Sequence, residues 1–537
     1  MKFIGIDLGT TNSCISVMSE GKDEITTLET GKTGQYTLPS VVYYGGTEPV
    51  VGDNAKKKLF ANADKTVKLA KTYLGTDKTW VIEGNTYTPI DVSADILKRL
   101  IGIYHDVYGD EPYECVITCP ANYLQDKRDM VKQAAEQAGI EIKNLLNEPT
   151  AAAISFFENN PDLIGETVVI FDLGGGTLDV TVATCVENED GMPRFEVRTS
   201  KGIERLGGAN WDVEVQNELL MQCALKSGKS EEEIRSNVQD CSRIQYEAEG
   251  YKIALSSGDI DDDFTLSCTG ELINFVFTQE DFERRTEGLL MQAMTIFDNA
   301  LTYAFNDDSD GLEPVTEESI KNIILVGGSS RMPQIKNAIL ERHPAFEGKI
   351  LLRDPDLSIS KGAAYYCKMS GRTDENSGIV LTEKLQNSFG VACFINQSMI
   401  PLSPDSYSMR RSGLFGVCNN QLFAGDTLPC SNTEHYSTEY EGQPEIKLGI
   451  MQNNVSKDSI EVQYVERSKC KQIYDTIIPL PANTPKGTNV MIKMEADISG
   501  CLHVYYEVAG KSGEATIKIK SDAILSDSKE VDDLLGE

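Results

Sequence analysis

Two distant stretches of the chain repeat one pattern: Phe3–Val17 reads FIGIDLGTTNSCISV, and Val168–Val182 reads VVIFDLGGGTLDVTV. Each has an apolar run, Asp-Leu-Gly, a turn rich in glycine and threonine, and a second apolar run. Two short apolar runs joined by such a turn predict a β-hairpin. Glycine lets the backbone approach a ligand closely, and successive amides in the turn form an anion-binding concavity. Two such hairpins facing each other would hold a polyphosphate from both sides.

The aspartates beside these turns point to a metal ion. Asp7, Asp172 and Asp179 flank the turns, and a bare carboxylate repels a phosphate group. A divalent cation between them makes the arrangement favourable, and magnesium suits because it keeps several waters and binds through few carboxylates plus phosphate oxygens. The candidate phosphate-binding residues are Gly9, Thr10, Thr11, Asn12, Gly174, Gly175, Gly176 and Thr177.

A single glycine-rich turn between buried strands is common and would by itself be read as a plain turn. Two matched copies with aspartates in register favour a Mg-nucleotide site. The sequence has neither G-x-x-x-x-G-K-[ST] nor a G-x-G-x-x-G that opens a helix. It is therefore not a P-loop or dinucleotide-binding domain of the usual kinds.

Two further segments give weaker signals. ILVGGSSRMP runs from an apolar strand through Gly327 and Gly328 into a helix, whose N-terminus can bind an anion. Alone, it would be an ordinary strand–helix connector. EAEGYKIALSS predicts a helix with Glu249, Lys252 and Ser256 on one face, which by itself is typical of a solvated surface.

The composition restricts the class of protein. With 537 residues we expect two to four domains. The net charge of −33 argues against nucleic acid and against an anionic membrane surface, and it favours apolar or basic partners such as unfolded polypeptide. The 13 scattered cysteines indicate reduced thiols. Because the N-terminus enters a strand-like run directly, we expect no signal peptide and a cytoplasmic location.

The pattern of elements divides the chain. Residues 1–371 alternate strand-like and helical runs, as in YECVITCP followed by QDKRDMVKQAAEQAGI, which predicts α/β layers. Residues 372–388 are expected to form a linker. Residues 389–521 show short alternating runs with turn signals at DISG and GKSG, which predict an antiparallel β-sandwich. Residues 522–537 form a short acidic tail.

Five motifs then connect the chain to a known family. GIDLGTTNS, NEPTAAA, FDLGGGTLDVTV, LGG at Leu206–Gly208 and ILVGGSSRMP occur in order. This set resembles the DnaK-type seventy-kilodalton heat-shock chaperones, closely from Met1 to about Lys368 and more weakly in the β part. The resemblance implies a two-lobed, actin-like ATPase fold around a nucleotide cleft, followed by a peptide-binding β-sandwich. It also implies ATP/ADP and Mg²⁺ as cofactors, polypeptide clients, a J-domain co-chaperone, a nucleotide exchange factor and a monomeric chain.

The resemblance also assigns roles to residues. Lys71 and Glu148 match the catalytic lysine and its glutamate partner, which act with Asp7, Asp179 and Thr177. Asp7, Asp172 and Asp179 match the acids that hold hydrated magnesium through water. Pro120 and Arg128 match an allosteric relay, although without the resemblance they would be a strand-end proline and an exposed helical arginine. The remaining implied nucleotide contacts, beyond the phosphate turns, are Gly207, Gly208, Glu249, Lys252, Ser256, Gly327, Gly328, Ser329, Arg331 and Asp356.

The sequence departs from the family pattern in three places. The linker's apolar run is broken at Thr382, Glu383 and Lys384, and lost linker contacts could erase a coupling of about 1–3 kcal/mol. The family pattern has a basic residue just before NEPT. In this sequence that position is Asn144, with Lys143 beside it. We expect no helical lid after the sandwich, so bound peptide should leave quickly. No peptide-pocket residues are assigned, because the region around 389–399 matches poorly.

Three other functions stay open. An actin-fold small-molecule kinase would need a substrate pocket and a base between the lobes, and such kinases rarely end in an all-β module. A filament-forming protein usually stops near the end of the α/β part. A binding module dedicated to one client, with weak or uncoupled ATPase, is the strongest alternative because of the divergent linker and the missing lid.

Overall fold

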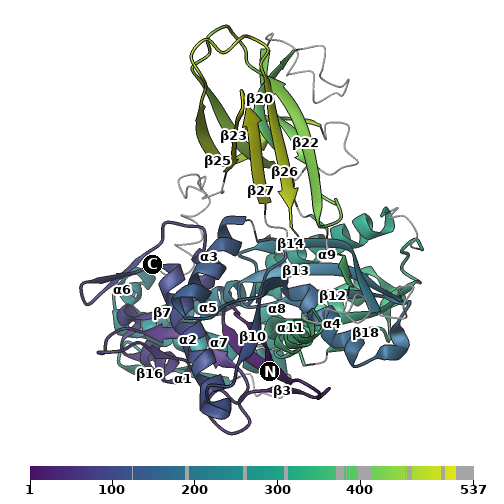
Figure 1. Cartoon of the computed structure of the whole chain (residues 1–537). Helices are drawn as coiled ribbons and strands as arrows, with labels where there is room; N and C mark the ends of the chain where they lie inside the picture. The colour runs from purple at the N-terminus through teal and green to yellow at the C-terminus, as the bar shows by residue number, and fades with distance from the viewer. Residues whose placement is uncertain are drawn as a thin grey trace. The chain divides into compact units, whose positions relative to one another are not determined.

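The computed structural model describes residues 1–123, 125–187, 193–257, 263–307, 313–352, 354–370, 380–382, 384–385, 387–396, 414–453, 455, 463–497 and 502–515. These residues divide into two compact units. Met1–Tyr123 and Asp129–Leu381 belong to the larger unit. Residues 125–128, at the start of α3 (Gln125–Gln137), group with the smaller unit, which otherwise begins at Thr382. Figure 1 labels the helices and strands of both.

The first repeated stretch forms the predicted hairpin inside a mixed sheet of the larger unit. β1 (Lys2–Asp7) and β2 (Asn12–Ser19) pair antiparallel, with Asp7 opposite Cys14. β1 also pairs in parallel with β10 (Tyr113–Cys119). The described strand order is β11 (Asn144–Asn147), β10, β1, β2 and β3 (Ile25–Thr27), with β4 (Leu38–Pro39) paired to β2.

The second repeated stretch occupies the same place in a second sheet. β12 (Thr167–Leu173) and β13 (Thr177–Glu187) pair antiparallel, with Asp172 directly opposite Asp179. β12 pairs in parallel with β17 (Ile320–Val326), as β1 does with β10. The described order is β18 (Ile350–Leu352), β17, β12, β13, β14 (Pro193–Glu204) and β19 (Val380–Thr382). The two related halves therefore each build one sheet around one hairpin.

Helices and small sheets surround these two sheets. The α-helices are α1 (Asp53–Lys56), α2 (Pro89–Tyr108), α3 (Gln125–Gln137), α4 (Glu148–Glu158), α5 (Gly208–Ser227), α6 (Glu231–Arg235), α7 (Val238–Ser257), α8 (Gln279–Arg285), α9 (Glu287–Phe305), α10 (Pro333–Arg342) and α11 (Ser358–Met369). Two short 3-10 helices carry site residues, η3 (Ala70–Tyr73) and η5 (Gly328–Arg331). The small strands are β5 (Val41–Tyr43), β6 (Val50–Val51), β7 (Thr66–Lys68), β8 (Trp80–Ile82), β9 (Asn85–Tyr87), β15 (Asp263–Cys268) and β16 (Glu271–Val276).

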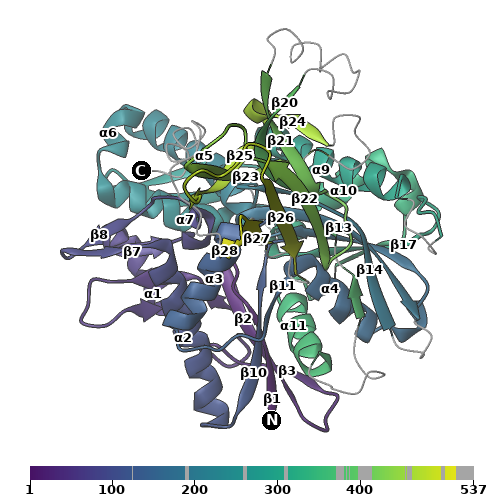
Figure 2. The ribbon, with the colours of Figure 1, turned by 45° about the horizontal axis from the view of Figure 1, so that its top comes forward.

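Helices α4 and α11 pack against each other in the core of the larger unit. Figure 2 shows them side by side. Gly362 of α11 allows this approach, because a Cβ there would lie 1.8 Å from the carbonyl oxygen of Ala151 on α4. One buried apolar cluster joins both helices to strands of both sheets, through Val116 of β10 and Val168 of β12. The helix pair thus fixes the two sheets, and the two hairpin turns, relative to each other.

The smaller unit is an antiparallel β-sandwich. One sheet has the described order β24 (Tyr464–Glu466), β21 (Leu414–Leu422), β20 (Ser388–Asn396), β23 (Glu445–Asn453) and β25 (Lys471–Pro479). The other has the order β22 (Cys430–Ser437), β26 (Asn489–Ala496), β27 (Leu502–Val508) and β28 (Lys511–Ala515). A common core joins them, with Ile450 and Ile473 from the first sheet and Met494 and Val504 from the second.

Several expectations can be compared with these elements. The strand and helix expected for YECVITCP and QDKRDMVKQAAEQAGI are β10 and α3. The turn predicted at GKSG lies one to two residues earlier than the motif. Positive φ angles occur at Ala509 and Gly510, and β28 already begins at Lys511. The DISG turn lies outside the described residues after Asp497, as do residues 516–521, the tail 522–537 and linker residues 372–379, 383 and 386. The predicted domain boundaries stay predictions.

Two general expectations also bear on these residues. All 12 cysteines in the described part of the chain are free thiols. Among the described residues, no helix has both the length and the apolar character needed to cross a membrane.

Candidate functional site

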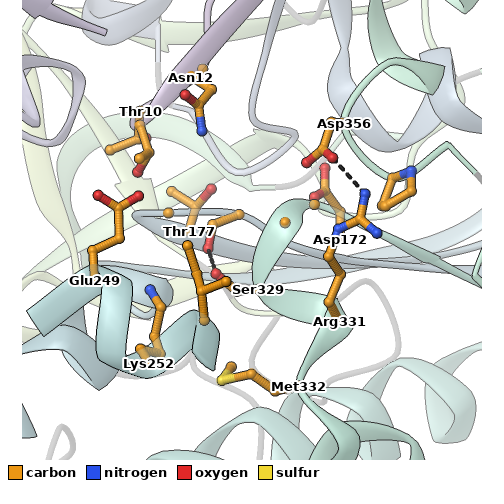
Figure 3. Close-up of a pocket in the computed structure, with 18 of the residues that line it drawn as sticks. Thr10, Asn12, Asp172, Thr177, Glu249, Lys252, Ser329, Arg331, Met332 and Asp356 are labelled. Carbon is orange, nitrogen blue, oxygen red and sulfur yellow. Dashed lines mark hydrogen bonds and ion pairs between the residues drawn. The ribbon is translucent and has the colours of Figure 1, made fainter. Parts of the chain in front are cut away.

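A cavity of about 550 Å³ in the larger unit collects residues from both repeated stretches. Most of the residues predicted to form a site line it. These are Asp7, Gly9, Thr10, Thr11, Asn12, Lys71, Glu148, Asp172, Gly174, Gly175, Thr177, Glu249, Lys252, Ser256, Gly327, Gly328, Ser329, Arg331 and Asp356. Figure 3 shows side chains of this cavity on several elements that are far apart in the sequence.

The first turn is held open by hydroxyl groups behind it. The Gly9 amide donates to the Ser13 hydroxyl at 3.1 Å, and the Ser40 hydroxyl donates to the Gly9 carbonyl at 2.7 Å. These bonds fix the backbone between β1 and β2, so that Thr10 and Thr11 lie at the cavity wall. The turn is therefore shaped before any ligand arrives.

The second turn comes within contact distance of the first. A Cβ on Gly175 would lie 1.8 Å from the hydroxyl oxygen of Thr11, so only glycine allows this approach. The Gly208 and Ala209 amides donate to the Gly174 and Gly175 carbonyls, each at 2.9 Å. Residues of both turns therefore lie next to each other in the wall of one cavity.

A buried ion pair lies at the inner end of the cavity. The Lys71 ammonium is 2.6 Å from the Glu148 carboxylate, and the two side chains are 4% and 8% exposed. Lys71 comes from η3 and Glu148 begins α4, so tertiary packing alone brings them together. Burial alone would lower the pKa of Lys71, but the Glu148 and Asp7 carboxylates outweigh it and raise that pKa. Lys71 therefore stays charged.

The cavity wall carries more negative than positive charge. Its described residues include six carboxylates, Asp7, Glu148, Asp172, Asp212, Glu249 and Asp356, and three basic side chains, Lys71, Lys252 and Arg331. Burial, and next the nearby Glu148, raise the pKa of Asp7 to about 7 and hold those of Asp172 and Asp179 well above the ordinary value. An anionic ligand would be repelled here unless a cation accompanies it.

These acids fit a hydrated magnesium ion. Asp7 and Asp172 line the cavity from the two hairpins, and hard carboxylate oxygens are the ligands that Mg²⁺ prefers. Asp179, directly opposite Asp172 on the neighbouring strand, is 1% exposed and has a buried Oδ1 atom without a hydrogen-bond partner among the described residues. Within the described part of the chain, no group of three His, Cys, Asp or Glu side chains is close enough to hold a metal directly. The predicted contact through water needs no such group and stays a prediction.

Helix α7 presents its predicted polar face to the cavity. Glu249 and Lys252 project from this helix in Figure 3. The Lys252 ammonium lies 2.7 Å from Asp212 and 3.1 Å from the Gly208 carbonyl, and Glu249 accepts from Lys56 at 2.5 Å. The stripe that would pass for a solvated surface is therefore a wall of the cavity, and only the resemblance indicated this.

The third turn closes another side. The Ser329 hydroxyl donates to the Gly174 carbonyl at 2.9 Å, which ties η5 to the second hairpin turn. Arg331 and Asp356 form an ion pair of 2.6 Å that Figure 3 shows beside Asp172. The segment ILVGGSSRMP, which by itself would be an ordinary strand–helix connector, therefore lines the cavity together with the two hairpins.

Some predicted residues do not line the cavity. Gly207 packs directly behind the second turn, where a Cβ would lie 2.4 Å from the Gly176 amide nitrogen. A Cβ on Gly208 would lie 2.3 Å from the Ser329 hydroxyl. These glycines shape the wall from behind. The predicted residues outside the lining set are Gly176, Asp179, Gly207, Gly208, Pro120 and Arg128.

Six further lining residues are not among the predicted site residues. Asp212, Ile253, Ser257, Met332, Pro355 and Ile359 also line the cavity. Ile253 and Ser257 lie on α7, where they flank the predicted face, and the helical period could have indicated them. Asp212 and Ile359 lie on α5 and α11, and nothing local distinguishes them from ordinary helix residues.

Comparison with known protein families gives one further finding. A family model described as Hsp70 protein matches residues 3–537, which is essentially the whole chain.

Proposed function

This chain belongs to the Hsp70 family, and we propose that it is a molecular chaperone that binds exposed apolar peptide segments and hydrolyses ATP in a Mg²⁺-dependent reaction. The observation that carries the proposal is the cavity between the two hairpin turns, with the buried Lys71–Glu148 pair at its inner end. Two glycine-rich turns, an acidic wall and one fixed ammonium group are what a Mg-triphosphate requires.

The residues at the inner end would carry the chemistry. The Lys71 ammonium stabilises negative charge that develops on the γ-phosphoryl oxygens. The Glu148 carboxylate holds that ammonium in place and, with Asp179 and Thr177 near the second turn, orients the attacking water. Mg²⁺ would supply charge neutralisation on the phosphates, held through water by Asp7, Asp172 and Asp179. Glu249, Lys252, Ser256 and Arg331 would hold the adenosine end.

The β-sandwich would bind the polypeptide. In peptide-binding sheets an extended chain is held by main-chain hydrogen bonds, while pockets select its side chains. Residues 397–413 and 456–462, which follow β20 and β23, lie outside the described residues. We therefore propose the sandwich as the client site without naming pocket residues.

Co-chaperones would act on the larger unit. Asn144 begins β11, and the neighbouring Lys143 ammonium is paired with Glu114 at 2.7 Å. A J-domain partner that relies on a free basic side chain at this position would find none at Asn144 and a neutralised one at Lys143. We propose that a J-domain partner and an exchange factor are used, with Asn144 altering which J-domain binds.

The dedicated client-binding module remains the second candidate, favoured by the interrupted linker. Val380–Thr382 form strand β19, next to β14 at the edge of the second sheet. The polar residues Thr382, Glu383 and Lys384 interrupt the apolar sequence directly after Leu381, so the linker offers fewer apolar contacts for coupling the two units. The kinase and the filament have no specific observation in their favour.

The test is ATP turnover by the full chain, with and without a short apolar peptide. We expect basal phosphate release without any acceptor substrate, stimulation by peptide, and a fall of about 100-fold or more in Lys71→Ala, the size typical for a lost transition-state contact. Lys336→Ala is the matched control, because Lys336 is an exposed lysine on α10 outside the cavity.

The outcomes separate the candidates. Turnover that does not respond to peptide would favour the dedicated binding module. Turnover that depends on a small-molecule acceptor would favour the kinase. Absence of turnover in the unmodified chain, or normal turnover in Lys71→Ala, would overturn the catalytic assignments. Circular dichroism of Lys71→Ala checks that the unpaired Glu148 has not unfolded the protein.

A further inference from the structure

Two cysteines of the β-sandwich contact each other outside the core that joins its two sheets. Cys418 lies on β21, directly opposite Val465 of β24, and Cys470 immediately precedes β25. The two thiols are hydrogen-bonded to each other. They pack with Met451 and Val465 in a small cluster that is separate from the common core. Neither cysteine lines the cavity of the proposed ATPase.

The two thiols differ in exposure and in acidity. Cys418 is fully buried, whereas Cys470 is half-buried and can be reached from solvent. The hydrogen bond from the Cys418 thiol lowers the pKa of Cys470, and the Asn453 amide acts in the same direction. Burial and the Glu466 carboxylate oppose this effect without cancelling it. The hydrogen bond to Cys470, and next burial, raise the pKa of Cys418. Cys470 is therefore the thiol that loses its proton first.

An accessible thiol beside a buried one favours oxidation of the pair to a disulfide. The thiolate is the form of cysteine that reacts with a peroxide, so exposure and a lowered pKa select the cysteine that reacts. A second thiol in contact with it can then attack the oxidised sulfur. Cys470 fits the first role, and Cys418 fits the second.

The position of Cys470 gives such a bond a structural effect. Strands β24 and β25 are the two edges of the first sheet in the described strand order, and both are labelled in Figure 2. Only the short helix η10 (Arg467–Lys469) and Cys470 connect them. This crossover has to pass the three strands that lie between the two edges. A bond to Cys418 would attach its last residue to β21, inside the sheet.

We propose that Cys418 and Cys470 are an oxidation site for a peroxide, and that their disulfide fixes this crossover to β21. The Cys470 thiolate attacks one peroxide oxygen, the O–O bond breaks, and a sulfenic acid forms while the other oxygen leaves as water. The Cys418 thiol then attacks the Cys470 sulfur, and its proton leaves with the hydroxyl group as a second water. One hydrogen peroxide is thus reduced to two waters while two thiols become one disulfide. The site does not depend on the proposed function, because thiol oxidation is measured without nucleotide or client.

A second pair of thiols, in the larger unit, gives an internal comparison. Cys223 on α5 and Cys268 at the end of β15 are also hydrogen-bonded to each other. Both are fully buried, and burial raises the pKa of each thiol. Because the two pairs share the contact and differ in accessibility and acidity, peroxide should oxidise the pair in the sandwich and leave Cys223 and Cys268 reduced in the folded chain.

The test is peptide mapping of the folded full chain after treatment with hydrogen peroxide and alkylation of the remaining thiols. We expect a disulfide between Cys418 and Cys470 that dithiothreitol removes. Cys470→Ser should abolish this disulfide, and Cys418→Ser should leave a Cys470 sulfenic acid that dimedone traps. The matched control is Cys430→Ser, because Cys430 is also half-buried but lies on β22 in the other sheet. This variant should form the disulfide as the unmodified chain does.

Denaturant titration measures the effect on the crossover. A disulfide stabilises a folded unit mainly by restricting its unfolded chain. The unfolding midpoint of the smaller unit should therefore rise on oxidation and return to its reduced value with dithiothreitol. Cys470→Ser should show no rise, and its circular dichroism checks that the reduced variant is folded.

Three results would overturn the proposal. The first is oxidation of other cysteines without a bond between Cys418 and Cys470. The second is a disulfide from Cys418 to Cys393 on the neighbouring strand β20, which would assign the site to another pair. The third is equal oxidation of Cys223 and Cys268 in the folded chain, which would mean that peroxide does not select the accessible pair. A disulfide that leaves the unfolding midpoint unchanged would overturn the effect on the crossover alone.

Discussion

Asp172 and Asp179 lie opposite each other on paired strands, both buried. Like charges in this position destabilise a hairpin, and burial adds a desolvation cost. The strands Thr167–Leu173 and Thr177–Glu187 nevertheless stay paired along their length in the middle of their sheet. The unfavourable pair makes sense if ligand binding brings a cation to it. The site is thus prepared for a charged ligand at some cost to the stability of the free protein.

The close contact of the two turns predicts the effect of one added methyl group. Gly175→Ala places a Cβ 1.8 Å from the Thr11 hydroxyl, so the turns must move apart. Overpacking of this kind costs about 1–3 kcal/mol. We expect ADP affinity to fall roughly 10- to 100-fold, measured by titration calorimetry.

Gly46→Ala is the control for Gly175→Ala, because the nearest atom to its new Cβ is 3.5 Å away. Its affinity for ADP should equal that of the unmodified chain. Unchanged ADP affinity in Gly175→Ala would mean that the second turn does not contact the nucleotide.

The pairing of α4 with α11 determines how the two sheets are held. Gly362 packs on the backbone of α4, with its Cβ position 1.8 Å from the Ala151 carbonyl oxygen. Gly362→Ala should therefore lower the free energy of unfolding of the larger unit by about 1–3 kcal/mol. Denaturant titration would measure this. Gly102→Ala, in the interior of α2 with open space around its Cβ, should leave stability unchanged or slightly raised.

A buried amide pair plays a comparable part in the sandwich. Asn420 of β21 and Asn453 of β23 exchange hydrogen bonds of 2.9 and 3.4 Å across the central strand β20. Asn453→Ala removes one of the two amides, and burying the other with fewer partners costs about 1–3 kcal/mol. We expect the smaller unit alone to unfold earlier in denaturant. An equal shift for the larger unit would show that the two units unfold together.

The whole molecule should report ligand binding as added stability. A ligand at 100 times its Kd stabilises the folded state by about 2.7 kcal/mol. Because six carboxylates line the cavity against three basic groups, ADP with Mg²⁺ should raise the midpoint of thermal unfolding more than ADP with a chelator. Scanning calorimetry would show this in the larger unit, and equal shifts in both conditions would contradict the predicted role of the metal.

The sequence by itself determined the parts of this protein that depend on local pattern. Apolar periodicity and glycine-rich turns predict the hairpins at Phe3–Val17 and Val168–Val182. Apolar periodicity also predicts the helix that follows YECVITCP. Backbone hydrogen bonding between near neighbours is enough to specify such elements. The repeated pattern therefore predicts both turns, and their proposed role in phosphate binding, without any knowledge of the contact between them.

Only the tertiary structure decided which residues meet. Lys71 and Glu148 lie far apart in the sequence, and neither differs locally from an ordinary helix residue until packing buries them at 2.6 Å. Asp212 and Ile359 line the first cavity but have no local signal in the sequence. The physical reason is that long-range packing determines how deeply a side chain is buried and which charged groups lie near it. A local sequence pattern does not contain this information.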